Sequence, residues 1–318
     1  MSEVFIVCPA HTTSGGPELC HQLADTLNQD QPGRASVVYW PFIRAALPAP
    51  PYRDYDARPA MRAEITPGSI VVLPETYGRL LCDFPGSRIF YWWMSVNNFY
   101  REAGIDARIE LAQIRRHVTA NLYQSEYARR FCASAGLAHA NRLSDKLSDG
   151  YLHAITHPPT VARRNIIAYN PAKGLARTTA VLRALDQGLR QAPQVIPLEH
   201  LTAAQLREVL ATVKVYIDFG EHPGKDRLPR EAAAMGATVL TNRRGAAGNT
   251  VDMPIPEEFK IDDHRRGFER RAAEKIHLLL DQFDVQAPRF GPYRRMILAE
   301  PRLFADDARA AFTARVPV

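Results

Sequence analysis

The stretch VYIDFGEHPGKDRLPREAAAMGATVLTN, residues 215–242, decides the fold. Its first five residues, 215–219, are rich in β-branched and aromatic side chains and predict a buried strand. A loop with two glycines follows, and residues 229–235 then favour a helix that Gly236 can end in a left-handed conformation. A second apolar run, 237–240, predicts the next strand. Strand, loop, helix and strand in this order form the repeating unit of a parallel sheet.

Cations gather in this stretch where the helix is expected to begin. Lys225, Arg227 and Arg230 lie around the predicted helix start, where unpaired N–H groups and the helix dipole already favour an anion. Glu231, in the first turn, has two oxygens that can accept hydrogen bonds from the hydroxyls of a ribose. A phosphate site beside a diol site indicates a nucleotide. A surface crossover with solvated charges is the alternative interpretation of the same residues.

Composition narrows the class of protein. At 318 residues, with 46% apolar and 23% charged residues, we expect a globular chain with two domains. No run approaches the roughly 20 apolar residues of a membrane span, and the first residues do not have the pattern of a secretory signal. The cysteines show no paired spacing, which is typical of a reducing cytoplasm. They are Cys8, Cys20, Cys82 and Cys132.

The charge balance is basic, with a formal net charge of +6 that comes almost entirely from arginine, because only six lysines are present. A basic surface attracts phosphates, anionic lipid headgroups or nucleic acid. The arginines occur in scattered pairs without a dense block, so the charge gives only weak support for an anionic partner.

In the first half of the chain, expected strands alternate with expected helices, as they do in residues 215–242. A loop, residues 9–16, separates the first strand from a helix that opens at Pro17, and its glycine pair would let the backbone approach a ligand closely. Residues 41–67 are rich in proline, which predicts a long irregular connection. Polar residues follow the third and fourth strands and should rim a crevice at the carboxyl edge of the sheet. The expected strands are residues 4–8, 37–40, 70–75, 88–93 and 118–123.

The second half starts a new series after a proline-containing hinge at residues 151–164. The C-terminal region, 293–315, reads as one or two helices broken near Pro301. We therefore expect an α/β protein with two doubly wound, Rossmann-like domains facing across a cleft, residues 1–155 and 156–318, and with C-terminal helices that can pack back on the first domain. The expected strands of the second series are residues 165–169, 195–198, 215–219 and 237–240.

Four motifs in this order resemble a known family. Ser14-Gly15-Gly16-Pro17-Glu18 precedes the first helix, and Tyr123-Gln124-Ser125-Glu126-Tyr127 comes late in the first domain. Asn170-Pro171-Ala172-Lys173-Gly174 comes early in the second domain, and residues 215–242 follow. Together they resemble a GT-B glycosyltransferase of the family 4 type (glycosyl transferases group 1), over most of the chain.

The resemblance implies roles for particular residues. Gly15 and Gly16 resemble the glycine pair that lets the first loop reach the donor phosphates and the acceptor. Lys173 resembles the lysine that contacts the donor diphosphate, and Glu231 resembles the second Glu of the E-x7-E motif, which binds the ribose. The loop around Gly245 resembles the turn beside the donor.

The chain also departs from the family pattern. Pro223 stands eight residues before Glu231, where the first Glu of the motif would be, so Glu221 or His222 would have to take its place. The arginine expected about six residues before Lys173 is absent, and Lys225, Arg227 or Arg230 would have to replace its charge. These departures concern the residues that would contact the donor sugar and set the stereochemistry.

The family resemblance implies a transferase that moves a sugar from a nucleoside-diphosphate sugar to a glycan or lipid-linked acceptor, with no cofactor besides this donor substrate. Pre-placed positive charge at the leaving phosphate is the main catalytic requirement. A retaining reaction needs no dedicated protein base, whereas an inverting one needs a base in the first domain, for which His11 is the candidate. A loop histidine that bonds to the backbone is the other interpretation of His11. No metal-binding constellation is visible, so we expect a metal-independent enzyme.

Other functions remain open at this point. A GT-B enzyme that glycosylates a modified base in DNA would suit the arginine content, although no alternation of basic and aromatic residues demands it. A binding protein without turnover would explain Pro223. A sugar-nucleotide epimerase on the same fold is disfavoured because no buried acid and base pair is evident. The expected location is the cytoplasm, with peripheral contact at the inner membrane face left open.

Overall fold

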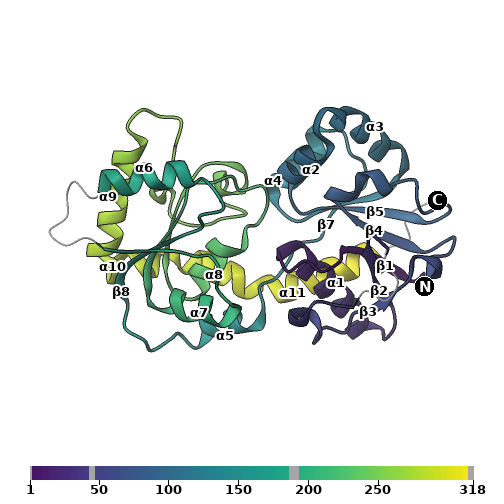
Figure 1. Cartoon of the computed structure of the whole chain (residues 1–318), viewed down its shortest axis with the longest axis horizontal. Helices are drawn as coiled ribbons and strands as arrows, with labels where there is room; N and C mark the ends of the chain where they lie inside the picture. The colour runs from purple at the N-terminus through teal and green to yellow at the C-terminus, as the bar shows by residue number, and fades with distance from the viewer. Residues whose placement is uncertain (1, 43–46, 186–192, 314–318) are drawn as a thin grey trace. The chain divides into compact units, whose positions relative to one another are not determined.

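The computed structural model describes residues 2–42, 47–185 and 193–313. The described residues form two compact units (Figure 1). Unit 1 takes its residues from Met1–Lys146 and Pro301–Val318, and unit 2 is Leu147–Glu300. The sequence-based boundary at 155/156 falls inside a helix of unit 2, α5 (Asp149–Thr156). None of the described helices combines the length and apolar character that crossing a bilayer requires.

Unit 1 contains a parallel sheet of seven strands in the order β3-β2-β1-β4-β5-β6-β7. Its strands are β1 Val4–Pro9, β2 Ala35–Trp40, β3 Arg58–Ala60, β4 Ile70–Pro74, β5 Arg88–Trp93, β6 Val118–Tyr123 and β7 Ala140–Arg142. Its helices are α1 Gly15–Asp30, α2 Val96–Ala103, α3 Ala107–His117 and α4 Glu126–Ser134, with the second part of α11 Gly291–Thr313. Every strand pair is parallel, as the repeated strand–helix pattern predicted.

Both faces of this sheet are buried. On one face Val4, Ile6 and Cys8 pack in a core with residues of α1 and α11, and on the other face Val7 packs with residues of α2, α3 and α4. Alternate residues of β1 therefore enter different cores, which explains why the strand is apolar throughout. Figure 1 shows α2 and α3 on one side of the sheet and α1 on the other.

Unit 2 contains a parallel sheet of five strands in the order β12-β11-β10-β8-β9. Its strands are β8 Arg164–Tyr169, β9 Gln194–Pro197, β10 Val213–Asp218, β11 Thr238–Asn242 and β12 Lys260–Ile261. Its helices are α5, α6 Leu175–Leu185, α7 Ala203–Thr212, α8 Arg227–Ala234, α9 Phe268–Asp281, α10 Phe283–Gln286 and the first part of α11. In Figure 1, α6 and α9 cover one face, and α5 and α7 lie on the other. The predicted α/β class with two parallel sheets is confirmed.

Short 3-10 helices complete the described elements. They are η1 Pro50–Tyr52, η2 Arg62–Glu64, η3 Glu75–Leu80, η4 Gly104–Asp106, η5 Gly245–Gly248, η6 Glu257–Phe259 and η7 Ala287–Phe290.

Two sequence-based expectations need correction. Residues 41–67 are not wholly irregular, because β3 pairs with β2 at the sheet edge, a position that tolerates Pro59; residues 43–46 lie outside the described part. The break expected near Pro301 is wrong, because α11 continues through it. Ile297 before the proline and Phe304 after it are both fully buried, so packing on both sides holds the helix together despite one lost hydrogen bond.

Candidate functional site

The candidate site in unit 2 lies where the strand order reverses. β8 and β10 are neighbours in the sheet. The strand that follows β8 in the chain, β9, lies on one side of this pair, and the strand that follows β10, β11, lies on the other side. The loops after two such strands diverge, and this is where open parallel sheets bind ligands. The loop after β8 carries Lys173, and the loop after β10 carries His222 and Asp226.

Two glycines bring these loops together. A Cβ on Gly174 would lie 2.5 Å from the carbonyl oxygen of Phe219, and a Cβ on Gly220 would lie 2.6 Å from the Cβ of Lys173. Gly174 also has a φ of +59°, a conformation that glycine adopts without strain. Side chains at these positions would separate Lys173 from the loop after β10.

Lys173 belongs to a charge cluster with Asp218, His222 and Asp226. Its Nζ lies 2.8 Å from Asp226 Oδ2, and His222 Nδ1 lies 3.0 Å from the same oxygen. His222 Nε2 lies 3.9 Å from Asp218 Oδ1. The side chain of His222 is fully buried, whereas that of Lys173 is 33% exposed. The lysine ammonium is therefore the part of the cluster that a ligand can most easily reach.

The protonation of the cluster follows from its contacts. Burial by itself would lower the pKa of His222, but Asp218 and Asp226 outweigh burial and raise it. Burial would raise the pKa of Asp226, but His222 and Lys173 outweigh burial and lower it. Burial raises the pKa of Asp218, which accepts hydrogen bonds from the Tyr216 hydroxyl and the Gly220 N–H. Asp226 is thus held as an anion by its contacts with His222 and Lys173.

The same cluster has the make-up of a metal site, which the sequence analysis did not foresee. Asp218, His222 and Asp226 each offer one ligand atom, and these atoms lie within 4.8 Å of one another. Lys173 Nζ already lies 2.8 Å from the Asp226 oxygen of this set. Because the Lys173 ammonium already pairs with Asp226, an ion-pair network accounts for the cluster, and metal independence stays a prediction.

Two of the predicted phosphate-binding cations are held by Glu300 of α11. Arg230 Nη1 lies 2.9 Å from both carboxylate oxygens of Glu300, and Lys225 Nζ lies 2.9 Å from one of them. The Arg230 guanidinium also donates to the carbonyls of Lys225 and Asp226. Arg230 and Glu300 are each only 1% exposed. Arg230 therefore stabilises the loop between β10 and α8 through contacts within unit 2.

Arg227 and Glu231 pair on the first turn of α8. Arg227 Nε lies 3.1 Å from Glu231 Oε1, and the two side chains are 22% and 7% exposed. The helix begins at Arg227, so Pro229 is its third residue rather than its first, as the sequence had suggested. Gly236 ends it with a φ of +95°, as predicted. Both side chains lie at the helix end that favours anions.

The loop after β11 packs against the loop after β10. A Cβ on Gly245 would lie 1.9 Å from the carbonyl oxygen of His222, and the Ala246 N–H donates to that oxygen over 2.7 Å. Arg244 Nη1 lies 2.7 Å from Glu221 Oε1, and the Glu221 side chain is 52% exposed. The structure thus brings the regions of Gly245, Glu221 and His222 together.

The remaining candidates belong to unit 1. His11, Gly15 and Gly16 follow β1, at the point where β1 and β4 mark the strand-order reversal of that sheet. His11 is exposed and has a φ of +58°, and Gly15 is the first residue of α1. A Cβ on Gly16 would meet only Met94 Cε, at an ordinary 3.9 Å, so packing within unit 1 does not require glycine there.

Glu75 follows β4, a position where polar residues were expected to rim a crevice, but the structure buries it to 2% exposure. Its Oε2 accepts the N–H of Met94 over 3.1 Å, which ties the end of β4 to the end of β5. Burial raises the pKa of Glu75 to about 7, against hydrogen bonds that lower it. Glu75 is therefore an internal carboxyl group that titrates near neutral pH.

Sequence analysis missed Asp218, Asp226 and Glu300 as functional candidates. Asp218 ends a buried strand, and together with His222 and Asp226 it recurs every four residues, a spacing that was visible before the structure. Glu300 gave no comparable signal, because it meets Arg230 from 70 residues away.

Taken together, the fold and the arrangement of strand-end loops define a GT-B fold, the two-unit α/β fold of many glycosyltransferases. The sequence matches no protein-family model and no curated protein. Solved structures do match it. HepE from Anabaena, solved with UDP, is 11% identical over 98% of each chain with a TM-score of 0.66.

Two synthases show the same likeness. Sucrose-phosphate synthase from Thermosynechococcus elongatus is 12% identical over 98% of each chain, with a TM-score of 0.69. α,α-Trehalose 6-phosphate synthase from Burkholderia multivorans is 10% identical, covering 99% of this chain and 98% of the other, with a TM-score of 0.65. At these identities the likeness establishes the fold.

Proposed function

We propose that this chain is a glycosyltransferase that moves a sugar from a nucleoside-diphosphate sugar to a glycan or lipid-linked acceptor. One observation carries the proposal: the Lys173 ammonium lies 2.8 Å from Asp226, the residue that immediately precedes α8. A partly exposed lysine is thereby held beside a helix N-terminus at a strand-order reversal. HepE, a structure of the same fold, has been solved with UDP and with UDP-glucose.

The roles follow from the charge that develops in such a reaction. Negative charge grows on the departing diphosphate, and fixed donors aimed at it lower the barrier. Lys173 and the N–H groups of the first turn of α8 are the donors that we assign to the diphosphate, with Arg227 beside them. Glu231, paired with Arg227 over 3.1 Å, is assigned to the ribose hydroxyls.

His222 takes a positioning role in this proposal. Its side chain is fully buried, so it cannot take a proton from an acceptor in the open site. It holds Asp226, which in turn holds Lys173. Glu221 has an exposed side chain and remains the candidate for contact with the donor sugar.

We further propose that transfer is retaining and independent of metal. A retaining reaction needs no protein base, which suits a site in unit 2 whose buried carboxylates are engaged in ion pairs. If the reaction is inverting, His11 of unit 1 is the base that we assign. The site of action that we propose is the cytoplasm.

The test is a panel of UDP-, GDP-, ADP- and dTDP-sugars, with thermal stability and slow donor hydrolysis as readouts. A true donor at ~100 times its dissociation constant should stabilise the protein by about 2.7 kcal/mol. Stabilisation with hydrolysis, or with transfer to an acceptor, supports the proposal. Stabilisation without any turnover would favour a binding protein, and salt-sensitive binding of duplex DNA would point to a DNA acceptor. The absence of stabilisation by every sugar nucleotide would overturn the proposal.

A further inference from the structure

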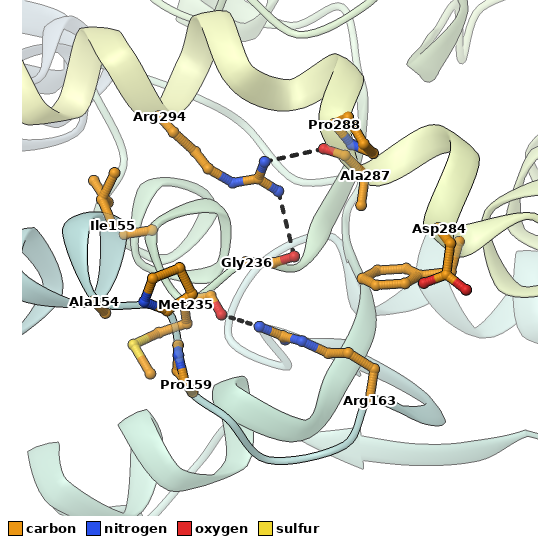
Figure 2. Close-up of a pocket in the computed structure, with 13 residues that line it drawn as sticks. Ala154, Ile155, Pro159, Arg163, Met235, Gly236, Asp284, Ala287, Pro288 and Arg294 are labelled. Carbon is orange, nitrogen blue, oxygen red and sulfur yellow. Dashed lines mark hydrogen bonds between the residues drawn. The ribbon is translucent and has the colours of Figure 1, made fainter.

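A pocket of about 460 Å³ lies at the C-terminal end of α8, within unit 2 (Figure 2). Its volume falls within the range of roughly 300–1,000 Å³ that is usual for small-molecule sites. Most of its wall is apolar and comes from α5, residues 158–159, α10 and η7. The proposed donor site involves the opposite, N-terminal end of α8. The lining residues are Ala154, Ile155, Pro158, Pro159, Arg163, Ala234, Met235, Gly236, Phe283, Asp284, Ala287, Pro288 and Arg294.

The first of two arginines in this pocket comes from α11. Arg294 Nε donates to the carbonyl oxygen of Ala233 over 3.0 Å, and its Nη2 donates to that of Gly236 over 3.3 Å. Its Nη1 donates to the carbonyl of Ala287 over 3.0 Å. Figure 2 shows this side chain reaching from the helix toward Gly236.

The second arginine reaches the adjacent peptide unit. Arg163 Nη2 donates to the carbonyl oxygen of Met235, and its Nη1 donates to the carbonyls of Leu210 and Val213 over 2.9 and 2.7 Å. Because Met235 and Gly236 are consecutive, the guanidiniums of Arg163 and Arg294 converge on neighbouring carbonyls, as Figure 2 shows. Two positive charges are thus brought close together.

Among the described residues, no carboxylate forms an ion pair with the guanidinium of Arg163 or Arg294. Within the described part of the chain, the hydrogen bonds of both guanidiniums go to main-chain carbonyls. A helix C-terminus offsets only about half of one unit charge. Asp284 is the one acidic residue of the lining, and within the described part of the chain it is not ion-paired with either arginine. A guanidinium has five N–H donors, and three of each are engaged. The pocket therefore keeps excess positive charge and N–H groups to donate.

We propose that this pocket binds a small amphiphilic anion, with a carboxylate or phosphate monoester at Arg163 and Arg294 and an apolar body against the surrounding wall. Both head groups match the guanidinium fork. The wall residues that would contact the body are Ile155, Pro159 and Phe283. This assignment is independent of the proposed glycosyl transfer, because it uses none of the donor-site residues.

Calorimetric titration of the full chain tests the proposal with hexyl phosphate, hexanoate, inorganic phosphate and hexanol as probes. One of the two amphiphilic anions should bind saturably, at least about tenfold more tightly than inorganic phosphate and hexanol. Preference between hexyl phosphate and hexanoate identifies the head group. The proposal would be overturned if neither amphiphilic anion binds saturably up to about 10 mM. It would also be overturned if inorganic phosphate or hexanol binds as tightly as the amphiphilic anions do.

Variants locate the binding. Arg294→Gln should weaken it by about tenfold or more, but this change also removes hydrogen bonds that hold the end of α8. Two substitutions of exposed lining residues avoid that risk: Asp284→Asn should strengthen binding about threefold, and Pro158→Glu should weaken it about threefold. Lys173→Ala should leave it unchanged. Unaltered affinity in both lining variants, or loss of affinity in Lys173→Ala, would contradict the site.

Discussion

Lys173 Nζ and Asp226 Oδ2 are 2.8 Å apart, a contact that joins the loop after β8 to the residue that precedes α8. His222 reaches the same oxygen from the buried side. Gly174 and Gly220 leave room for this contact, because a Cβ on either would collide with the facing loop. The contact fixes a positive charge at the start of a helix, where the backbone already favours an anion.

His222 should stabilise the fold more at acidic than at basic pH. Its pKa is raised in the folded protein, so its contribution is complete below the unfolded pKa of about 6.5 and is lost as the pH rises through the folded value. We expect His222→Gln to cost about 3 kcal/mol at pH 5.5 and less at pH 8.5, measured by urea unfolding. A cost that does not change with pH would contradict the raised pKa of His222.

Glu300 should be essential to unit 2. Removing it leaves Arg230, which is 1% exposed, without the carboxylate that it contacts at 2.9 Å. We expect Glu300→Ala to lower the free energy of unfolding by about 3–5 kcal/mol. The exposed pair Arg270–Glu274 provides the control, since Glu274→Ala should cost about 0.5 kcal/mol or less. Equal effects of the two substitutions would show that the buried contact does not hold the loop.

Glu75 should make the protein less stable as the pH rises. Its pKa is about 7 in the folded state, against an ordinary value of 4.5, so the folded state holds the proton more tightly and stability falls between these two values. At about 1.4 kcal/mol per pH unit, wild type should lose about 3 kcal/mol relative to Glu75→Gln between pH 4.5 and pH 7. Parallel stability curves for the two proteins would refute the buried, protonated carboxyl.

Glu231 should select for ribose. If its carboxylate binds the ribose hydroxyls, wild type should bind UDP about tenfold more tightly than 2′-deoxy-UDP, a difference of the size of one charge-assisted hydrogen bond. Glu231→Gln should bind both with nearly equal affinity, whereas Glu221→Gln should keep the preference. If Glu231→Gln still prefers UDP as strongly as wild type does, another residue contacts the ribose.

Local signals predicted much of the fold. Ser125 and Thr202 are residue types that favour helix N-caps, and their hydroxyls accept the N–H groups of Ala128 and Gln205. The apolar run before Gly220 was expected as a buried strand and is β10. These features depend on residues within a few positions of one another, so a single sequence contains the information.

The features that the sequence did not predict depend on contacts between segments that are distant in the chain. Pro301 lies inside a continuous helix because side chains before and after it are buried, and no local pattern reveals that burial. Arg230 was predicted only as a cation near the helix start, and its partner Glu300 lies 70 residues away in the sequence. The Lys173–Asp226 contact likewise links separate strands across 53 residues, as the difference between their numbers shows. Predicting such contacts requires the sheet order.

Calorimetric titration of UDP into wild type and Lys173→Ala tests whether Lys173 binds the donor diphosphate. We expect Lys173→Ala to weaken UDP binding by about ten- to a hundredfold, because a charge-assisted hydrogen bond to the diphosphate is lost. The matched control is Lys214→Ala, which removes a lysine at the opposite end of β10, where Nζ bonds Asn165 Oδ1 over 2.7 Å; it should leave the affinity unchanged. Equal UDP affinity in wild type and in a folded Lys173→Ala would contradict the account.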